Sequence, residues 1–409
     1  MRLLVIGAGL SGLVTAQEVQ KAGHQVVILE ARDRVGGRVF TIRDGLHDGQ
    51  YADVGAEMIY HGQDNILNLV AAQGLELTTE FSLGTDTPDI IFHGHRLSKE
   101  ASAELAQELR DGVKRTPPGF YETVAQWSRR ARLSEDAGKL LEAIAQGTPA
   151  APLRLADSQE LNVELSWGKG YRKIKGGNDR LPQALARGLD VRLNQLVRVI
   201  GHGSGGVTVE TERETFHGDR ALVTVPGPLV QELGFDPVLP AEKIQALLQL
   251  RYGNGTRIVS QFKERDLVRE AIGLGCFTDR MPGYIMEQTM QQPGEHVVIS
   301  GLAAGDVEPA LMTEEQILDA FDETISAAVG RQVRRAYGYV KNWTQDPLTR
   351  SVVRAPLGDQ RETVLPEIRR PVGDRLFFAG EYTDDRIGPG GMEGAIKSAY
   401  RVSRELLDG

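Results

Sequence analysis

The stretch that decides the fold is residues 2–30, RLLVIGAGLSGLVTAQEVQKAGHQVVILE. Its apolar run Leu3–Ile6 shows no polar alternation, which is typical of a strand buried on both faces of a parallel sheet. We expect a helix over residues 13–22 that is closed by Gly23, and a second buried strand over residues 25–29. The order of strand, helix and strand predicts an α/β fold.

The loop between the first strand and the helix contains three glycines with separate functions. Gly7 permits a tight turn, Gly9 lets the backbone approach a pyrophosphate, and Gly12 lets the helix lie close to the strand. The phosphates then meet free N–H groups at the start of the helix, where Ser11 also lies. Glu30, at the tip of the second strand, can bind both hydroxyls of an adenosine ribose and would repel a 2′-phosphate. The stretch therefore predicts a dinucleotide site with a free ribose diol.

Length, net charge and residue composition indicate the number of domains and argue against several classes of partner and site. A chain of 409 residues is too long for one typical core, so two domains are expected. The net charge of −9 argues against nucleic acid or an anionic membrane as the main partner. Cys276 is the only cysteine and the eight histidines are scattered, so we predict neither a disulfide framework nor a metal site. The first strand begins too early for a signal peptide and no apolar run is long enough for a membrane span, so a cytoplasmic protein is expected.

A second phosphate-binding signal follows Glu30 directly. Paired glycines followed by an arginine, Gly36-Gly37-Arg38, let the backbone come close to another phosphate or to a ribityl chain while the guanidinium supplies charge. Residues 29–38, LEARDRVGGR, after the glycine loop resemble the FAD-binding N-terminus of the flavin amine oxidases, the superfamily of monoamine and polyamine oxidases. The resemblance implies that Ala31 and Arg32 belong to the cofactor site.

Three later blocks continue this resemblance. Residues 51–59, YADVGAEMI, match the segment whose backbone passes along the flavin in that superfamily, and the strand around Val197 matches the one that pairs with adenine. Residues 375–383, RLFFAGEYT, and 390–395, GGMEGA, match the C-terminal signature. There, Glu381 can hold a ribityl hydroxyl, and a helix opening near Met392 can direct N–H groups at a flavin carbonyl oxygen. The further cofactor-binding candidates in these blocks are Gly55, Ala56, Glu57, Met58, Gly380, Gly391 and Ala395.

The residues around Glu57 permit two interpretations. Glu57, Met58, Tyr60 and His61 could reach the flavin edge, or they could merely line a turn.

The resemblance implies a Rossmann-like, glutathione-reductase-like FAD-binding domain and a second, α+β, substrate-binding domain. We assign residues 1–80, 175–240 and 365–409 to the first domain and residues 81–174 and 241–364 to the second. Within them, Asn65 and Ser98 are candidate caps at the starts of two helices.

The implied activity is FAD-dependent oxidation of a C–N bond in an amine or amino acid. Hydride transfer to flavin N5 would be followed by hydrolysis of the imine and by reoxidation of the flavin by oxygen or another acceptor. If the substrate is an amino acid, its carboxylate needs a cation, for which Arg172 and Arg257 are the candidates.

This chain departs from the superfamily pattern at three places. Arg257 stands where members of the superfamily usually have a lysine that holds a water at flavin N5. We therefore take Arg257 as the candidate catalytic residue. The alternative is that Arg257 is an arginine in a strand that pairs with a surface acid. The two aromatic walls beside the substrate amine are replaced, one by residues 351–353 (Ser-Val-Val) and the other by Gly391. Covalent members attach flavin to a cysteine, whereas Cys276 lies in the substrate-domain sequence, so non-covalent FAD is expected.

Two other functions are compatible with these departures. A C–C desaturase or oxidase, resembling the phytoene desaturase and protoporphyrinogen oxidase branch, would explain the lost aromatic walls. A flavin-binding protein with little catalysis would explain both the lost walls and the substituted lysine.

Overall fold

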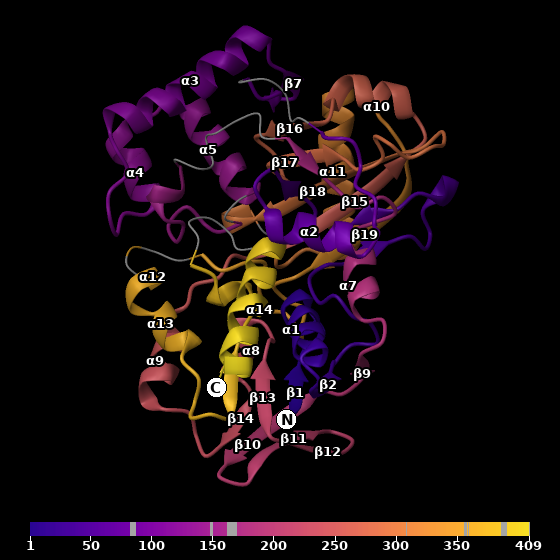
Figure 1. Ribbon diagram of the computed structural model, residues 1–409. Coiled ribbons are helices and arrows are strands. Elements are labelled where there is room, and N and C mark those ends of the chain that lie inside the picture. Colours follow the sequence, from indigo (N-terminus) through magenta and orange to yellow (C-terminus); the bar gives the residue numbers. More distant parts are fainter. Residues whose placement is uncertain are drawn as a thin grey trace.

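The molecule has two parts, each built on a β-sheet. The computed structural model describes residues 1–81, 87–147, 150–161, 170–307, 309–355, 358, 360–385 and 391–408. A parallel sheet and both chain termini lie in the lower part of Figure 1, and a larger mixed sheet lies in the upper part.

The lower sheet begins with the N-terminal stretch. Its strands, in spatial order, are β20 (Leu376–Phe378), β13 (Arg220–Val223), β1 (Arg2–Ile6), β2 (Gln25–Leu29) and β9 (Asp190–Arg192), all paired in parallel. Residues 3–6 of β1 are at most 1% exposed, as expected for a strand covered on both faces. The sheet thus collects strands from the beginning, middle and end of the chain.

Helices cover one face of this sheet and a second sheet covers the other. The helices are α1 (Leu10–Lys21), α2 (Asp64–Ala72), α7 (Arg180–Leu185) and α14 (Gly391–Asp408). The opposite face packs against β10 (Val197–Gly203), β11 (Gly206–Thr211), β12 (Thr215–Gly218) and β14 (Gly234–Asp236), with α8 (Gly227–Val230), α9 (Ala241–Gln249), α12 (Gln360–Thr363) and α13 (Leu365–Arg369) nearby. Helix α1 begins three residues before the predicted start, because Gly9 caps it directly after the turn.

The upper sheet carries the remaining long strands. Its order is β19 (Arg335–Asn342), β15 (Gly255–Phe262), β18 (Val297–Ala304), β17 (Tyr284–Glu287), β16 (Gly275–Thr278), β6 (Ile90–Phe92) and β7 (His95–Arg96). Helices α10 (Arg265–Ile272) and α11 (Glu314–Val329) pack against it in one apolar cluster. Helices α3 (Lys99–Arg115), α4 (Val124–Ala131) and α5 (Glu135–Gly147) form another cluster with β6. The predicted cap of α3 is confirmed, since the Ser98 hydroxyl accepts a hydrogen bond from the N–H of Ala101.

The prediction that Asn65 caps the helix before β6, α2, is wrong. Helix α2 begins at Asp64, so Asn65 lies inside its first turn. Its side-chain amide donates to Glu393 on α14 at 2.5 Å, and the other oxygen of Glu393 accepts the N–H of Ile66 at 2.9 Å. A carboxylate from a distant helix therefore caps α2, and no local pattern could reveal it.

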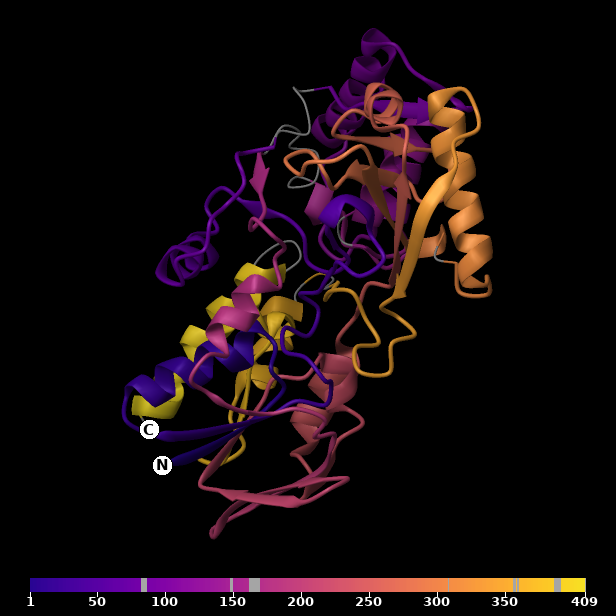
Figure 2. The same ribbon diagram turned by 90° about the vertical axis from the view of Figure 1, so that its right-hand side faces the viewer.

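Short segments join the two parts at their waist (Figure 2). They include β3 (Thr41–Ile42) paired with β4 (Ala52–Asp53), and β5 (Ile59–Tyr60) paired with β8 (Tyr171–Arg172). The indole N–H of Trp343, just beyond β19, donates to the carbonyl of Val54 at 2.8 Å. The segment that follows β4 is thereby fixed to the upper sheet.

Within the described ranges, no helix combines the length and the apolar character that a membrane crossing requires. The same residues contain no group of three or more His, Cys, Asp or Glu side chains placed to hold a metal ion.

Candidate active site

A continuous cavity runs from the glycine turn of the lower sheet to the upper sheet. Its walls contain most of the residues singled out from the sequence: Gly7, Gly9, Ser11, Glu30, Ala31, Arg32, Gly36, Gly37, Arg38, Gly55, Ala56, Val197, Arg257, Gly380, Glu381, Gly391, Met392 and Ala395. These residues come from segments spread over the whole chain. The fold therefore brings the separate sequence signals to one place.

The glycine turn is shaped as its spacing predicts. Gly7 has φ +105°, and a Cβ at Gly12 would lie 2.2 Å from the carbonyl oxygen of Gly7, so the helix can pack there only without a side chain. Thr224, directly after β13, donates its hydroxyl to the carbonyl of Ile6 at 2.8 Å. A Cβ at Gly9 would meet no atom within 4 Å, so that backbone is open to the cavity.

Glu30 lies at the tip of β2 with its orientation fixed. Its Oε2 accepts the N–H of Ala8 at 2.7 Å, and its Oε1 accepts the N–H of Arg32 at 2.9 Å. Burial raises the pKa of Glu30 above its ordinary value, while these two N–H groups act in the opposite direction. Each oxygen keeps a second lone pair, which can accept a hydroxyl such as those of a ribose.

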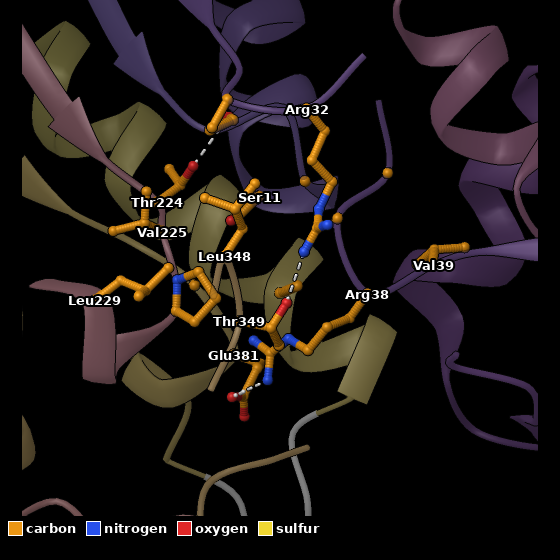
Figure 3. Close-up of a pocket in the computed structure, with 18 of the residues that line it drawn as sticks. Ser11, Arg32, Arg38, Val39, Thr224, Val225, Leu229, Leu348, Thr349 and Glu381 are labelled. Carbon is orange, nitrogen blue, oxygen red and sulfur yellow. Dashed lines mark hydrogen bonds and ion pairs between the residues drawn. The ribbon is translucent and has the colours of Figure 1, made fainter. Parts of the chain in front are cut away.

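Arg38 and Glu381 form an ion pair across the cavity (Figure 3). The guanidinium donates to Glu381 Oε1 at 3.0 Å and to the carbonyl of Val352 at 2.6 Å. The predicted phosphate cation and the predicted ribityl acid are thus partners in this structure.

A loop from the upper part crosses the lower end of the cavity and is fixed by Arg32. Arg32 Nη2 donates to Asp346 Oδ1 at 2.7 Å and to Thr349 Oγ1 at 2.9 Å. Lys341 also donates to Asp346, while residues 347–350 line the cavity. Figure 3 shows Thr349 and Leu348 beside Arg32. Asp346 and Thr349 were not among the residues predicted for the site from the sequence.

Arg257 lies on β15, where it lines the cavity near Leu302 and Trp343. Its side chain is 11% exposed, and its Nη1 is 3.3 Å from Oε2 of Glu57, whose side chain is 3% exposed. The alternative that Arg257 pairs with a surface acid is therefore wrong, because the acid is buried.

Three of the predicted cofactor residues do not line the cavity. Gly12 contacts the turn itself, as described above. Glu57 points away into a buried polar cluster, where it accepts hydrogen bonds from Lys173 and Gln288. Met58 packs in an aromatic cluster and its sulfur accepts the hydroxyl of Tyr60 at 2.7 Å. Neither Glu57 nor Met58 therefore lines the cavity, and both make their contacts within the protein.

The replaced aromatic walls leave an apolar surface. Val352 and Val353 line the cavity together with Leu302 and Trp343, while Ser351 is buried outside it. Cys276 is buried in β16 and does not line the cavity. Arg172 also lies outside it, where it pairs with Glu80 at 3.3 Å and is 39% exposed.

Comparison with known proteins agrees with this geometry. The family model described as flavin containing amine oxidoreductase matches residues 10–165 and 98–407. An L-amino-acid oxidase of Mus musculus is 28% identical over 98% of this chain and 70% of its own, and polyamine oxidase 4 of Oryza sativa subsp. japonica is 26% identical over 98% of this chain and 88% of its own.

Solved structures share the fold over the whole chain. Putrescine oxidase bound to putrescine superimposes with a TM-score of 0.83 at 18% identity, covering 100% of both chains. Cyclohexylamine oxidase from Brevibacterium oxydans IH-35A gives a TM-score of 0.83 at 19% identity, covering 99% of both chains. The predicted fold class is confirmed, and the chain belongs to the flavin-containing amine oxidoreductases, a family of flavin-dependent enzymes.

Proposed function

We propose that this protein is an FAD-dependent oxidase or dehydrogenase that acts on a C–N bond of an amine or amino acid. The observation that carries the proposal is the continuous cavity, which joins a dinucleotide cradle around Gly9 and Glu30 to an apolar chamber beside Arg257. The family and its amine-oxidising members support the same reaction type.

The residues present fit an adenine dinucleotide with a flavin. The open backbone at Gly9 suits a pyrophosphate, Glu30 suits the ribose diol, and Val197 lines the end where adenine would lie. Glu381 and Arg38 line the same cavity and would hold the ribityl and phosphate groups. Ranges 1–80, 175–240 and 365–409 would together hold the cofactor, and ranges 81–174 and 241–364 would hold the substrate.

When bound, FAD supplies the two-electron acceptor for oxidation of the C–N bond to an imine, which water hydrolyses, and oxygen or another acceptor restores its oxidised form. The chain itself has to orient the substrate and exclude water. Leu302, Trp343, Val352 and Val353 supply apolar walls for that purpose. The first turn of α14, at Gly391 and Met392, presents backbone N–H groups to the same cavity.

Reduction of the bound flavin under anaerobic conditions tests the reaction. We expect the visible absorbance of the flavin to bleach with at least one member of a panel of amines and amino acids, and peroxide or a reduced dye to appear when an acceptor is added. If no member of the panel bleaches the flavin, the proposed function is wrong. Bleaching by an apolar substrate without nitrogen would instead support the C–C desaturase.

We further propose that the FAD is held without a covalent bond, because Cys276 is buried away from the cavity. Acid precipitation of the holoprotein should leave a colourless pellet and a yellow supernatant. Colour that stays with the pellet after washing would contradict this. The cytoplasmic location expected from the sequence stays a prediction.

A further inference from the structure

The basic residues around the cavity differ in how their hydrogen-bond donors are used. Arg32 donates to the buried carboxylate of Asp346, Arg38 donates to Glu381 in the cavity wall, and Arg198 donates to Glu212 on the surface. Arg350 is half-exposed, so water can satisfy it. Arg257 is nearly buried, and within the part of the chain that the structure describes its guanidinium makes one ion-pair contact and donates no hydrogen bond.

The partner of Arg257 is already occupied on its other oxygen. Oε1 of Glu57 accepts hydrogen bonds from the ammonium of Lys173 and from the amide of Gln288. Lys173 Nζ also donates to Gln288 Oε1 at 2.7 Å, and the Gln288 amide donates to Ser300 Oγ at 2.8 Å. This network holds the carboxylate in place, so that it contacts Arg257 at one corner only.

The other charged groups near this cluster do not accept hydrogen bonds from Arg257, because they bind other partners. Asp53 is hydrogen-bonded to Thr41 Oγ1 at 2.6 Å and to the N–H of Asn178 at 3.0 Å, and burial raises its pKa to about 6. Lys341, which pairs with Arg257 across the β15–β19 ladder, is bonded to Asp346.

A buried guanidinium has five N–H donors in a planar fork, and leaving them without acceptors is costly. The matching acceptor is a carboxylate, which two parallel N–H groups can bind. We propose that Arg257 is the receptor for a carboxylate of the substrate, so that amino acids are preferred over the corresponding simple amines, and that Glu57, held by Lys173 and Gln288, is a positioning residue for Arg257. This inference rests on the proposed C–N oxidation and specifies its substrate class.

Binding of benzoate to the oxidised holoenzyme tests the receptor without turnover. We would follow the change in the flavin spectrum on titration with benzoate and, as the uncharged counterpart, with benzamide. In Arg257→Met we expect the Kd for benzoate to rise about 10- to 100-fold and the Kd for benzamide to change little, because only benzoate forms a bidentate ion pair with the guanidinium. Arg257→Lys should be intermediate, because lysine keeps the charge and loses the planar fork.

Arg172→Met is the matched control, since Arg172 is the other candidate cation and pairs with Glu80 outside the cavity. It should leave both Kd values unchanged. The receptor role is refuted if Arg257→Met shifts the Kd for benzoate less than twofold, or if benzamide is weakened equally.

Glu57 acts through Arg257 only if the two substitutions are coupled. Glu57→Gln should change the Kd for benzoate in the otherwise native protein and have no effect in the Arg257→Met background. Equal effects in both backgrounds would show that Glu57 has a separate structural role.

Matched substrate pairs separate this inference from the proposed function. Each pair consists of an amino acid, as either enantiomer, and the amine it yields on loss of its carboxylate, such as leucine with 3-methylbutylamine and phenylalanine with 2-phenylethylamine. We expect faster anaerobic flavin reduction by the amino acid of a pair, with an increase in KM in Arg257→Met. Reduction by the amines alone would uphold C–N oxidation and refute the carboxylate receptor. If neither member reduces the flavin, the proposed function fails, and the benzoate titration still decides the receptor.

Discussion

Replacing Gly9 with alanine is expected to weaken FAD binding strongly while leaving the apoprotein as stable as before. Gly9 has φ −74° and ψ 176°, a conformation that alanine adopts without strain, and a Cβ there would meet no protein atom within 4 Å. The methyl group would instead enter the cavity where the pyrophosphate is expected. A forced contact of this kind costs about 1–3 kcal/mol, so the Kd for FAD should rise by roughly 5- to 150-fold.

Gly12→Ala is the contrasting variant, because this glycine serves packing. Its Cβ would lie 2.2 Å from the carbonyl oxygen of Gly7 and 3.1 Å from a methyl group of Val5. The backbone at Gly7 cannot yield without moving β1 or α1, so we expect the free energy of unfolding of the apoprotein to fall by about 3 kcal/mol or more.

The two variants are compared by denaturant unfolding of the apoprotein and by titration with FAD. Loss of apoprotein stability in Gly9→Ala, or unchanged FAD affinity in that variant, would contradict the assignment of Gly9 to the pyrophosphate. The pair thereby separates a glycine that leaves room for a ligand from one that leaves room for the protein.

The success of the sequence predictions follows from how local their causes are. The strand β2 coincides with its prediction, and Ser98 caps its helix as expected, because both depend on residues adjacent in sequence. The start of α2 depends on Glu393, more than three hundred residues away, and was missed. A helix cap made by a neighbouring residue was therefore predictable, whereas a cap made by a side chain from a distant helix was not.

The same distinction explains the candidate site. Gly7 and Gly9 could be placed on the cavity because each glycine of that motif has a defined geometric purpose, and Gly55 could be placed there by the family resemblance. Side chains with several possible partners could not be placed. Glu57 follows Gly55 by two residues and yet turns to Lys173, which the sequence separates from it by more than one hundred residues. The partner of Arg257 could not be predicted for the same reason. It is Glu57, which is buried and also accepts hydrogen bonds from Lys173 and Gln288.

The loop that carries Asp346 connects the two parts of the molecule, and this connection was not predicted from the sequence. Arg32 follows Glu30, the acid at the tip of β2, by two residues, whereas Asp346 and Lys341 belong to the upper part. Their contacts hold residues 347–350 against the cavity. The ion pair is buried, with side chains 14% and 3% exposed, so solvent screens it little. Its loss should therefore affect both the stability of the protein and the retention of FAD.

Asp346→Asn is expected to lower the free energy of unfolding by about 2 kcal/mol at pH 7 and to accelerate FAD release. Burial alone would raise the pKa of Asp346, but hydrogen bonds from Arg32 and Lys341 outweigh it and lower the pKa to about 2. A carboxylate with a depressed pKa in the folded state stabilises the protein above its unfolded pKa, and this contribution disappears as the pH falls through the folded value. The difference between wild type and variant should be constant above pH 5 and fall to roughly half by pH 3.

Denaturant unfolding of both proteins between pH 7 and pH 3, with FAD fluorescence as the measure of release, checks this expectation. Asp374→Asn is the matched control, because Asp374 pairs with Arg375 at 3.4 Å and is 70% exposed, so its removal should cost less than about 1 kcal/mol at any pH. A stability difference for Asp346→Asn that is equally small, or that grows as the pH falls, would show that the charge of Asp346 does not fasten the loop. A difference that shrinks on acidification, together with faster FAD release, would show that one buried carboxylate couples the upper part of the molecule to the cofactor site.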